Sequence, residues 1–541
     1  MNLMRTSIGT FALLLFSVGA LSQNQAGTTV PIFKTQTELV MVPTVVMDHK
    51  GKPIPHLNRS DFTVYEDHQP RPIAFFEEVT PSTASPAKTI SGVAANYLEI
   101  DKSTAHLTIF VLDMVNTPFA GQAQARKVLL QTLDSFVDDG QPKALVLFTS
   151  SGVRVIHDFT SDPRALSQAL HRLVSNAPDT TNSNDFTKDA SLYQRLSDFS
   201  RPTNAEYSEF AQRIVKQSTV ECFREVAEAF SGVPGRKALI WATGGLSEWS
   251  DERGMPRMES FERIWAILNE ANIAVYPVDV REMGGPGFQG ASKGYHPVFP
   301  QTGGMYSRGY GGYGYGVGSI SEQASATMLS FARETGGKSC IGRTDLSGCF
   351  REALTESGSF YMIGYYLNHA YTKPGWHKLE VKTRLDNAKV RSRTGFKVAD
   401  KAAPLDLKTQ IETAVVAPLD YTAIPIATKW TGTPEEKEGK KQVSFAMLLP
   451  AGAFELDEQD NNRMDLEVMT VARQPNGQSV LLTDLAVQDH FNEKQAGKIK
   501  SDGFEYHNTL ELSPGTYNIR FLIRDNVTGK IGTVTSPLKV E

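Results

Sequence analysis

The chain is short of three features that would narrow its function. It has only three cysteines in 541 residues, and no histidine cluster lies near them, which argues against a thiolate zinc site. Lys and Arg are scattered and the formal net charge is −5, which argues against the basic stripe of a nucleic-acid-binding protein. Beyond the first 21 residues, no segment is long and apolar enough to span a membrane.

The three cysteines leave two states open. Cys340 and Cys349 are close enough in sequence to close a small disulfide loop in an oxidising compartment, or they remain as two thiols. In either state Cys222 has no partner, and we expect it to be buried as a small hydrophobic residue.

The N-terminus has the pattern of a secretory signal peptide over residues 1–22. Arg5 precedes an apolar run, Ile8 to Leu21, and small residues at Ala20 and Ser22 suit cleavage there. This predicts a secreted or periplasmic protein with no stable membrane span after cleavage. The alternative is that the segment is retained as an anchor.

At this length we expect two to four domains. Residues 28–82 contain β-type runs too short to form a core alone, so we predict that they join 372–400 as the split halves of a small β domain. Residues 83–103, which begin with a Pro-, Ser- and Thr-rich stretch, are predicted to be a linker. Residues 404–541 show evenly spaced short strands and turns typical of a β-sandwich.

The region 104–370 alternates strand-like and helix-like segments. This alternation predicts an α/β, doubly wound, mostly parallel sheet, flanked by the all-β domains. A strand at 107–112 ends in Asp113, and a helix begins after Thr117 and Pro118. Further strands are expected at 143–148, 153–159 (a hairpin with the former), 237–241, 273–280 and, last, 360–366, and a Gly- and Tyr-rich insertion at 284–318.

This region resembles the von Willebrand factor type A domain, through the order of its elements, the hairpin after 143–148, and Asp113 at the end of the first strand. The flanks TELVMVPTVVMDHKGKPIPHLNRSDFTVYEDHQPRPIAFF and WHKLEVKTRLDNAKVRSRTGF look like those of secreted bacterial VWFA-related domain proteins. The resemblance implies protein binding without catalysis, often through a divalent ion.

The resemblance also implies a metal-ion-dependent adhesion site, which this sequence matches only in part. The family pattern is Asp-x-Ser-x-Ser, a later Thr and a later Asp, because Mg²⁺ requires oxygen ligands. Here Val115 and Gly244 stand at two of these positions and cannot ligate. The candidate ligands of a degenerate, weak Mg²⁺ or Ca²⁺ site are Asp113, Asn116, Thr117 and Thr180. The favoured alternative is that Asp113 hydrogen-bonds its own turn, that Thr117 caps the helix, and that there is no cofactor.

Catalytic motifs are absent or misplaced. There is no HExxH or Walker A pattern, and Gly290–Gly294 and Gly309–Gly314 match catalytic or nucleotide motifs only within the Gly-rich insertion. We therefore predict a non-enzymatic protein that binds an unidentified protein at a rim containing Asp113, Thr117, Thr243 and Gly244. Two rivals remain: a cation-dependent adhesin with a variant site, and a hydrolase whose site is unrecognised.

Overall fold

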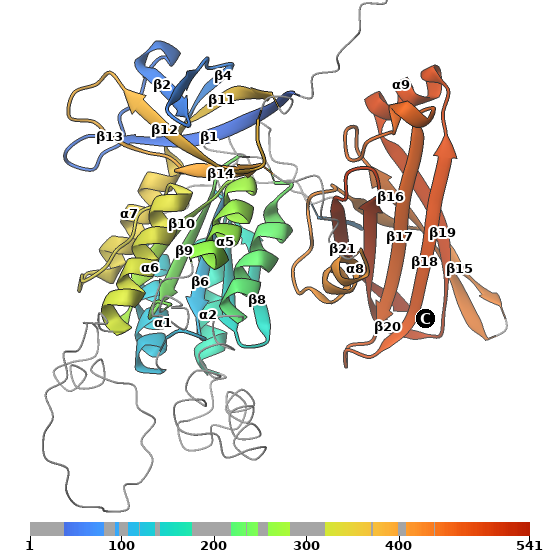
Figure 1. The fold of residues 1–541 in the computed structure, drawn as a ribbon. Helices are drawn as coiled ribbons and strands as arrows, with labels where there is room; N and C mark the ends of the chain where they lie inside the picture. The colour runs from blue at the N-terminus through green and yellow to red at the C-terminus, as the bar shows by residue number, and fades with distance from the viewer. Residues whose placement is uncertain are drawn as a thin grey trace, which may run out of the picture.

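The computed structural model describes residues 37–80, 92–96, 107–117, 119–135, 141–175, 218–233, 235–246, 258–281, 320–368, 372–398, 407–437 and 439–541. The predicted signal peptide, the Gly- and Tyr-rich insertion 284–318 and the rim loop containing Thr180 lie outside these residues. Figure 1 shows three groups of elements: two small sheets stacked over a helix-flanked sheet, and a strand-rich C-terminal unit beside them.

The predicted fold class is wrong. The described residues form five sheets, and four of these are antiparallel throughout. Parallel pairing is confined to one five-stranded mixed sheet, whose outer pair is antiparallel. The chain is therefore mainly antiparallel, not a doubly wound, mostly parallel α/β protein.

The mixed sheet has the order β10-β9-β6-β7-β8, with parallel pairs from β10 to β7 and an antiparallel β7–β8 hairpin. Its inner strands are apolar runs buried on both faces, which is why they show no alternation in the sequence. The five strands are β6 (Leu107–Asp113), β7 (Lys143–Thr149), β8 (Gly152–Thr160), β9 (Lys237–Thr243) and β10 (Ile273–Asp279).

Helices contribute to two separate cores of buried side chains around this sheet. One core joins it to α1, α2 and α7, and the other to α5, α6 and the helical residues 218–230. The helix predicted after Thr117 and Pro118 is α1, and α7 was not predicted. The bounds are α1 (Phe119–Asp134), α2 (Pro163–Ser175), α5 (Met258–Glu270), α6 (Ile320–Thr335) and α7 (Leu346–Gly358).

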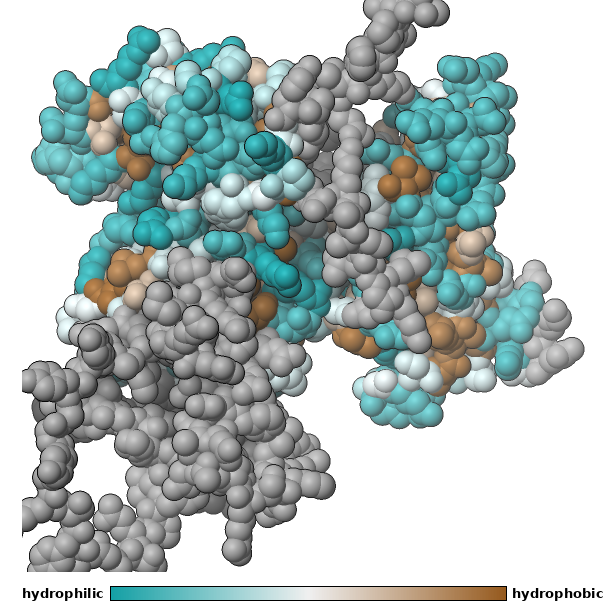
Figure 2. Space-filling view, viewed as in Figure 1, coloured by the Kyte–Doolittle hydropathy of each residue, from teal (hydrophilic) through white to brown (hydrophobic). Residues whose placement is uncertain are grey.

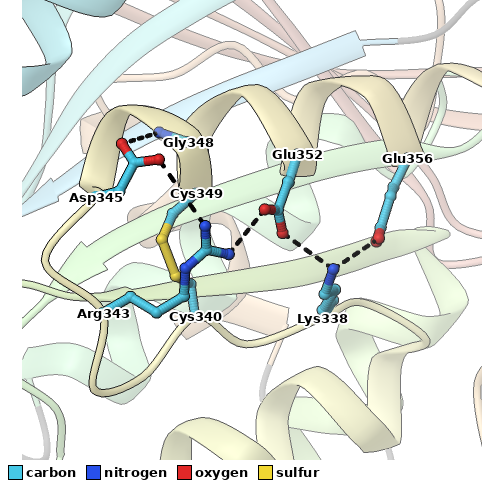
Figure 3. Close-up of a disulfide and its surroundings, with 8 residues drawn as sticks. All are labelled: Lys338, Cys340, Arg343, Asp345, Gly348, Cys349, Glu352 and Glu356. Atoms are coloured by element: carbon cyan, nitrogen blue, oxygen red, sulfur yellow. Dashed lines mark hydrogen bonds and ion pairs between the residues drawn. A yellow bond between two sulfur atoms is a disulfide. The ribbon is translucent and has the colours of Figure 1, made fainter. Parts of the chain in front are cut away.

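The disulfide Cys340–Cys349 joins α7 to the end of β10 (Figure 3). The backbone of Cys340 forms an isolated parallel β-bridge with Val278 of β10, and its N–H donates to Pro277 O at 2.8 Å. Asp345 caps α7 by accepting the N–H of Gly348 at 2.8 Å. The third cysteine, Cys222, is buried and unpaired.

Two four-stranded antiparallel sheets lie above the mixed sheet in Figure 1 and share one core. Their strands come from two distant parts of the chain: β1 pairs with β11, and β2 pairs with β12. The strand predicted at 360–366 is therefore not the last strand of the central sheet. The orders are β13 (Lys389–Arg391)-β1 (Thr37–Met47)-β11 (Phe360–Asn368)-β4 (Phe75–Val79) and β14 (Gly395–Val398)-β12 (Gly375–Thr383)-β2 (Phe62–Glu66)-β3 (Gln69–Arg71).

The C-terminal unit consists of two further four-stranded sheets that share a core. Within the segment predicted to be a linker, β5 (Val93–Ala95) pairs with β15, so this part of 83–103 is an edge strand. The orders are β19 (Phe504–Leu512)-β16 (Lys440–Leu449)-β15 (Ala427–Lys437)-β5 and β18 (Ser479–His490)-β17 (Arg463–Arg473)-β20 (Gly515–Asp525)-β21 (Ile531–Val540). Two helices accompany them, α8 (Leu407–Val416) and α9 (Glu493–Asp502).

The C-terminal unit is packed against the central region. Ile411 and Ala414 of α8 belong to the same buried core as Phe223 and Phe230 of the helix 218–230. Thr422 Oγ1 donates to Ala229 O at 2.7 Å and accepts the N–H of Gly232 at 3.1 Å. These contacts fix the C-terminal sheets to the helix that leads to the candidate site.

No helix among the described residues is long and apolar enough to cross a membrane. The face shown in Figure 2 is largely hydrophilic, with hydrophobic patches over the C-terminal strands.

Candidate functional site

Asp113 is the centre of the site predicted from the sequence. It ends the buried strand β6, and only 1% of it is exposed. Its carboxylate accepts five hydrogen bonds from two segments of the chain, its own turn and β9. Oδ1 accepts the N–H groups of Val115 (3.0 Å) and Asn116 (2.9 Å), and Oδ2 accepts Asn116 Nδ2 (2.7 Å), Trp241 Nε1 (3.0 Å) and Thr243 Oγ1 (2.7 Å).

The donors around Asp113 define its charge state. Burial raises the pKa of Asp113 overall, although hydrogen bonds from Asn116, Thr243 and Val115 act in the opposite direction. Four of the five donors are N–H groups, which can only donate. The ionised carboxylate, which only accepts, is the form that satisfies all of them.

The loop after β9 is fastened to the Asp113 turn. Thr243 Oγ1 accepts the N–H of Gly245 at 2.9 Å while donating to Asp113, and Thr117 Oγ1 accepts the N–H of Gly244 at 2.9 Å. Gly245 has φ +84°, and a Cβ there would lie 2.8 Å from the Cβ of Ala324. A side chain at 245 would therefore force the loop away from α6.

The described residues do not fit a divalent cation. Such a site needs several oxygen ligands with free lone pairs. The Asp113 carboxylate is already surrounded by donors, Val115 and Gly244 offer no side-chain oxygen, and Thr117 Oγ1 accepts a backbone N–H. Thr180, the fourth predicted ligand, lies outside the described residues.

Thr219, not a residue that we predicted, contributes a hydroxyl beside the Asp113 turn. It is fully buried, and its Oγ1 lies 2.9 Å from Asn116 Nδ2. The structure describes its helix over residues 218–230, and the signal in the sequence was the pair Ser218-Thr219 after a long polar stretch.

The four residues predicted to contact a partner are buried. The exposed fractions are 1% for Asp113, 6% for Thr117 and 0% for Thr243, and Gly244 is also buried. The structure does bring all four together, through the hydrogen bonds described above. They hold the Asp113 turn and the loop after β9 together beneath the surface of the rim.

A second carboxylate at this end of the sheet is also neutralised internally. Asp279 ends β10, and Arg281 binds both of its oxygens, with Nε 2.9 Å from Oδ1 and Nη2 2.7 Å from Oδ2. Arg281 Nη2 also donates to Ser325 Oγ of α6 at 2.8 Å. Neither of these two carboxylates is therefore left for a ligand.

Glu66, Asp67 and His377 form a cluster of potential metal ligands between β2 and β12. His377 Nδ1 lies 2.7 Å from Asp67 Oδ2, and Nε2 lies 2.7 Å from Lys373 O. Both ring nitrogens of His377 are therefore already engaged by oxygen atoms of the chain. Burial acts to raise the pKa of Asp67, but hydrogen bonds from the Lys378 N–H and His377 lower it overall. The cluster is a complete ion-pair network rather than a metal site.

The third candidate is the edge strand β18, which pairs on one side with β17. Its side chains Val480, Leu482 and Leu485 are 43%, 64% and 42% exposed. An edge strand has unpaired backbone N–H and C=O groups that another strand can join. β18 therefore combines unpaired backbone with exposed apolar side chains.

Comparison with known proteins does not assign the chain. No family model matches it, and no curated protein matches it. Among solved structures, it is similar to the pilus adhesin SpaC from Lactobacillus rhamnosus GG, with 8% identity, a TM-score of 0.24, and 86% of this chain and 58% of that chain covered. It is also similar to latent PorU from Porphyromonas gingivalis, with 16% identity, a TM-score of 0.14, and 34% of this chain and 14% of that chain covered. A third similar structure is Bacteroides uniformis β-glucuronidase, with 14% identity, a TM-score of 0.14, and 20% of this chain and 12% of that chain covered. The chain thus spans less than two thirds of each, and similarity at this level carries no argument about function.

Proposed function

We propose that this chain is a secreted, non-enzymatic protein-binding protein of the VWFA-related kind, and that it contacts an extended segment of its partner along β18. The observation that carries the proposal is the exposed apolar edge of that strand. Exposed apolar groups at a sheet edge favour a protein partner, because a paired strand satisfies the backbone and covers the side chains together.

β18 differs from the other edge strands described. At 12 residues it is the longest of them, and its sequence SVLLTDLAVQDH contains no Lys, Arg or Pro. Such residues usually protect an edge from joining another chain. The opposite edge of the same sheet, β21, has Pro537 and Lys539, and the edge strands β3, β5 and β13 are three residues long. The shorter edge strands β4 and β19 also lack Lys, Arg and Pro, but β18 is longer than either and is the strand of these three that carries exposed large apolar side chains.

The Asp113 turn has a supporting role in this proposal. Its polar groups are satisfied by one another, so it connects the ends of β6 and β9 to Thr219 of the helical residues 218–230. This support favours a rigid binding rim over a catalytic centre, where a reactive group must face its substrate. The rival cation-dependent adhesin has less support, because the described residues do not fit a cation.

The experiment is capture of partners from the native envelope fraction on the immobilised full chain. Leu482→Lys places a charge on the β18 edge, and Leu329→Lys changes a leucine of similar exposure (54%) on α6. We expect Leu482→Lys to lower capture by at least about tenfold. Placing one charge in an apolar strand contact should weaken binding by more than about 1.4 kcal/mol, which is the free energy of a tenfold change in affinity. Leu329→Lys and chelator should leave capture unchanged.

Two outcomes would count against the proposal. Equal capture by the Leu482→Lys and unaltered chains would remove β18 as the contact. Loss of capture in chelator would favour the cation-dependent adhesin instead. A screen with ester, peptide and glycoside substrates tests the hydrolase rival, and turnover abolished by a single substitution would support that rival.

A further inference from the structure

We infer that the side-chain amide of Asn116 takes the place of a bridging divalent cation between Asp113 and Thr219. Asn116 Nδ2 lies 2.7 Å from Asp113 Oδ2 and 2.9 Å from Thr219 Oγ1. The two oxygens come from segments 106 residues apart in sequence, and the nitrogen lies within hydrogen-bond distance of both. An oxygen ligand set of this kind, one carboxylate and one hydroxyl, is what a hard cation would bridge.

The chemistry of the amide explains why it can fill this position. An Asn side chain has two N–H donors on one nitrogen, so one atom can donate to two acceptors. The carboxylate oxygen requires a donor, which places Nδ2 rather than Oδ1 against Asp113. The nitrogen thus supplies the positive end of a dipole where the cation would supply a full charge, and it needs no ligand from solution.

The surrounding residues leave no second position for a cation. Trp241 Nε1 and Thr243 Oγ1 donate to the same Asp113 oxygen, at 3.0 and 2.7 Å. The backbone N–H groups of Val115 and Asn116 occupy the other oxygen. A cation would have to displace Asn116, and it would then find a single carboxylate that already accepts four other hydrogen bonds.

This inference makes a prediction about one atom. Asn116→Asp replaces the amide N–H₂ with an oxygen and puts a second carboxylate against Asp113 in a buried site. Two such carboxylates repel unless one is protonated or a cation lies between them. We therefore expect the variant to require a divalent cation that the natural chain does not need.

The experiment measures the thermal midpoint of the full chain in EDTA and in Mg²⁺, Ca²⁺ or Mn²⁺. Asn116→Asp should melt lower than the unaltered chain in EDTA and recover at least about 3 °C with one of the cations. The control is Asn508→Asp, which changes an amide that donates to Tyr506 Oη at 2.7 Å. The control and the unaltered chain should show no such recovery. An Asn116→Asp chain that no cation stabilises would overturn the inference.

Calorimetry with Mn²⁺ on the unaltered chain decides the matter if Asn116→Asp does not fold. We expect no Mn²⁺ binding that depends on Asp113. Any heat measured on adding Mn²⁺ should therefore be the same for the unaltered and Asp113→Asn chains. Stoichiometric binding that Asp113→Asn abolishes would contradict the inference. These outcomes concern the turn alone, so they are separate from the failure of the proposed function, which would appear as unchanged partner capture.

Discussion

The two ends of the five-stranded sheet bury opposite charges in the same way. At the carboxyl end, the Asp113 carboxylate is held by neutral N–H and O–H donors. At the amino end, Arg236, Lys237 and Arg393 are buried, with exposed fractions of 2%, 0% and 8%. In both places the buried group forms hydrogen bonds with oriented neutral dipoles.

The cations at the amino end bind carbonyl groups at or just beyond the ends of helices. Arg236 Nη2 donates to Gly336 O, just after α6, at 2.8 Å, and Arg393 Nη1 donates to Asn269 O, near the end of α5, at 2.6 Å. Lys237 Nζ donates to Val233 O, which follows the helix 218–230. Helix C-termini have unpaired carbonyls and a partial negative charge, so they stabilise cations.

The difference between the ends lies in how many segments one charge connects. Asp113 joins its own turn, β9 and, through Asn116, the helix 218–230. Arg236 and Lys237 each bind carbonyls that follow one helix, and Arg393 binds one near the end of α5 and Met41 O of β1. A carboxylate at the end of a strand can therefore be a structural centre without being a ligand, and removing it should disturb more of the fold than removing any of the cations.

The largest effect is expected for Asp113→Ala, which leaves two buried donors, Trp241 and Thr243, and three partly buried ones without their acceptor. We expect it to lower the free energy of unfolding by about 4 kcal/mol, the range for breaking a buried charged network. Urea unfolding followed by circular dichroism measures this loss. The control is Asp386→Ala in an exposed turn, with an expected change below about 0.5 kcal/mol. If the two substitutions had similar effects, Asp113 would not be the structural centre.

Arg236→Met should lower the free energy of unfolding by about 2 kcal/mol, less than Asp113→Ala. It removes one charged hydrogen bond, but it also removes a buried charge. The guanidinium also lies 5.7 Å from the ring of Tyr276 and 5.8 Å from that of Phe360. Arg384→Met on the exposed surface is the matched control. A loss equal to that of Asp113→Ala would break the proposed difference between the two ends.

Lys237 predicts a pH dependence at the amino end. Burial lowers its pKa from 10.5 to about 7, so between these values the unfolded chain binds a proton that the folded chain does not. Stability relative to Lys237→Met should therefore rise with pH from about 7 to 10, by up to about 1.4 kcal/mol per pH unit, and stay level below pH 7. Urea midpoints at pH 6, 7.5 and 9 test this. If the difference in stability between the unaltered and Lys237→Met chains did not change with pH, the backbone carbonyls would be keeping Lys237 charged.

The smallest effect is expected for Trp241→Phe, which removes one of the five donors to Asp113 and keeps an aromatic ring against Phe223 and Phe331. We expect a loss of about 1 kcal/mol. Trp430→Phe is the comparison, because its N–H binds the neutral hydroxyl of Ser536 at 3.1 Å. If Trp241→Phe lowered the free energy of unfolding less than Trp430→Phe, the Asp113 carboxylate would need fewer hydrogen-bond donors than the five it has.

Local structure was predictable from the sequence wherever a strong pattern exists. The run 107–112 lies within β6, the helix expected after Thr117 is α1, and β7 and β8 form the expected antiparallel pair. The importance of Asp113 and its neighbours was also predicted, because the sequence alone shows an acidic residue directly after an apolar strand. The favoured alternative, Asp113 bonded to its own turn, agrees with its hydrogen bonds.

The pairing of distant segments was not predictable in the same way. The apolar run 360–366 indicates a buried strand, but it does not say that β11 pairs with β1, more than 300 residues away. The same limit hid β5 within the predicted linker, and it hid Thr219, whose role depends on a contact with Asn116, 103 residues away in sequence. The fold class was wrong because it was inferred from the order of elements, whereas most of the pairing in this chain is antiparallel.

The central claim is that the Asp113 turn is held by its own hydrogen bonds and not by a metal ion. Crystals of the full chain soaked in Mn²⁺, measured at a wavelength where manganese scatters anomalously, test it most directly. We predict no anomalous peak at the turn, with Asn116 Nδ2 still between Asp113 and Thr219. A peak at about 2.1 Å from Asp113 Oδ2, with the Asn116 side chain turned away, would contradict the account.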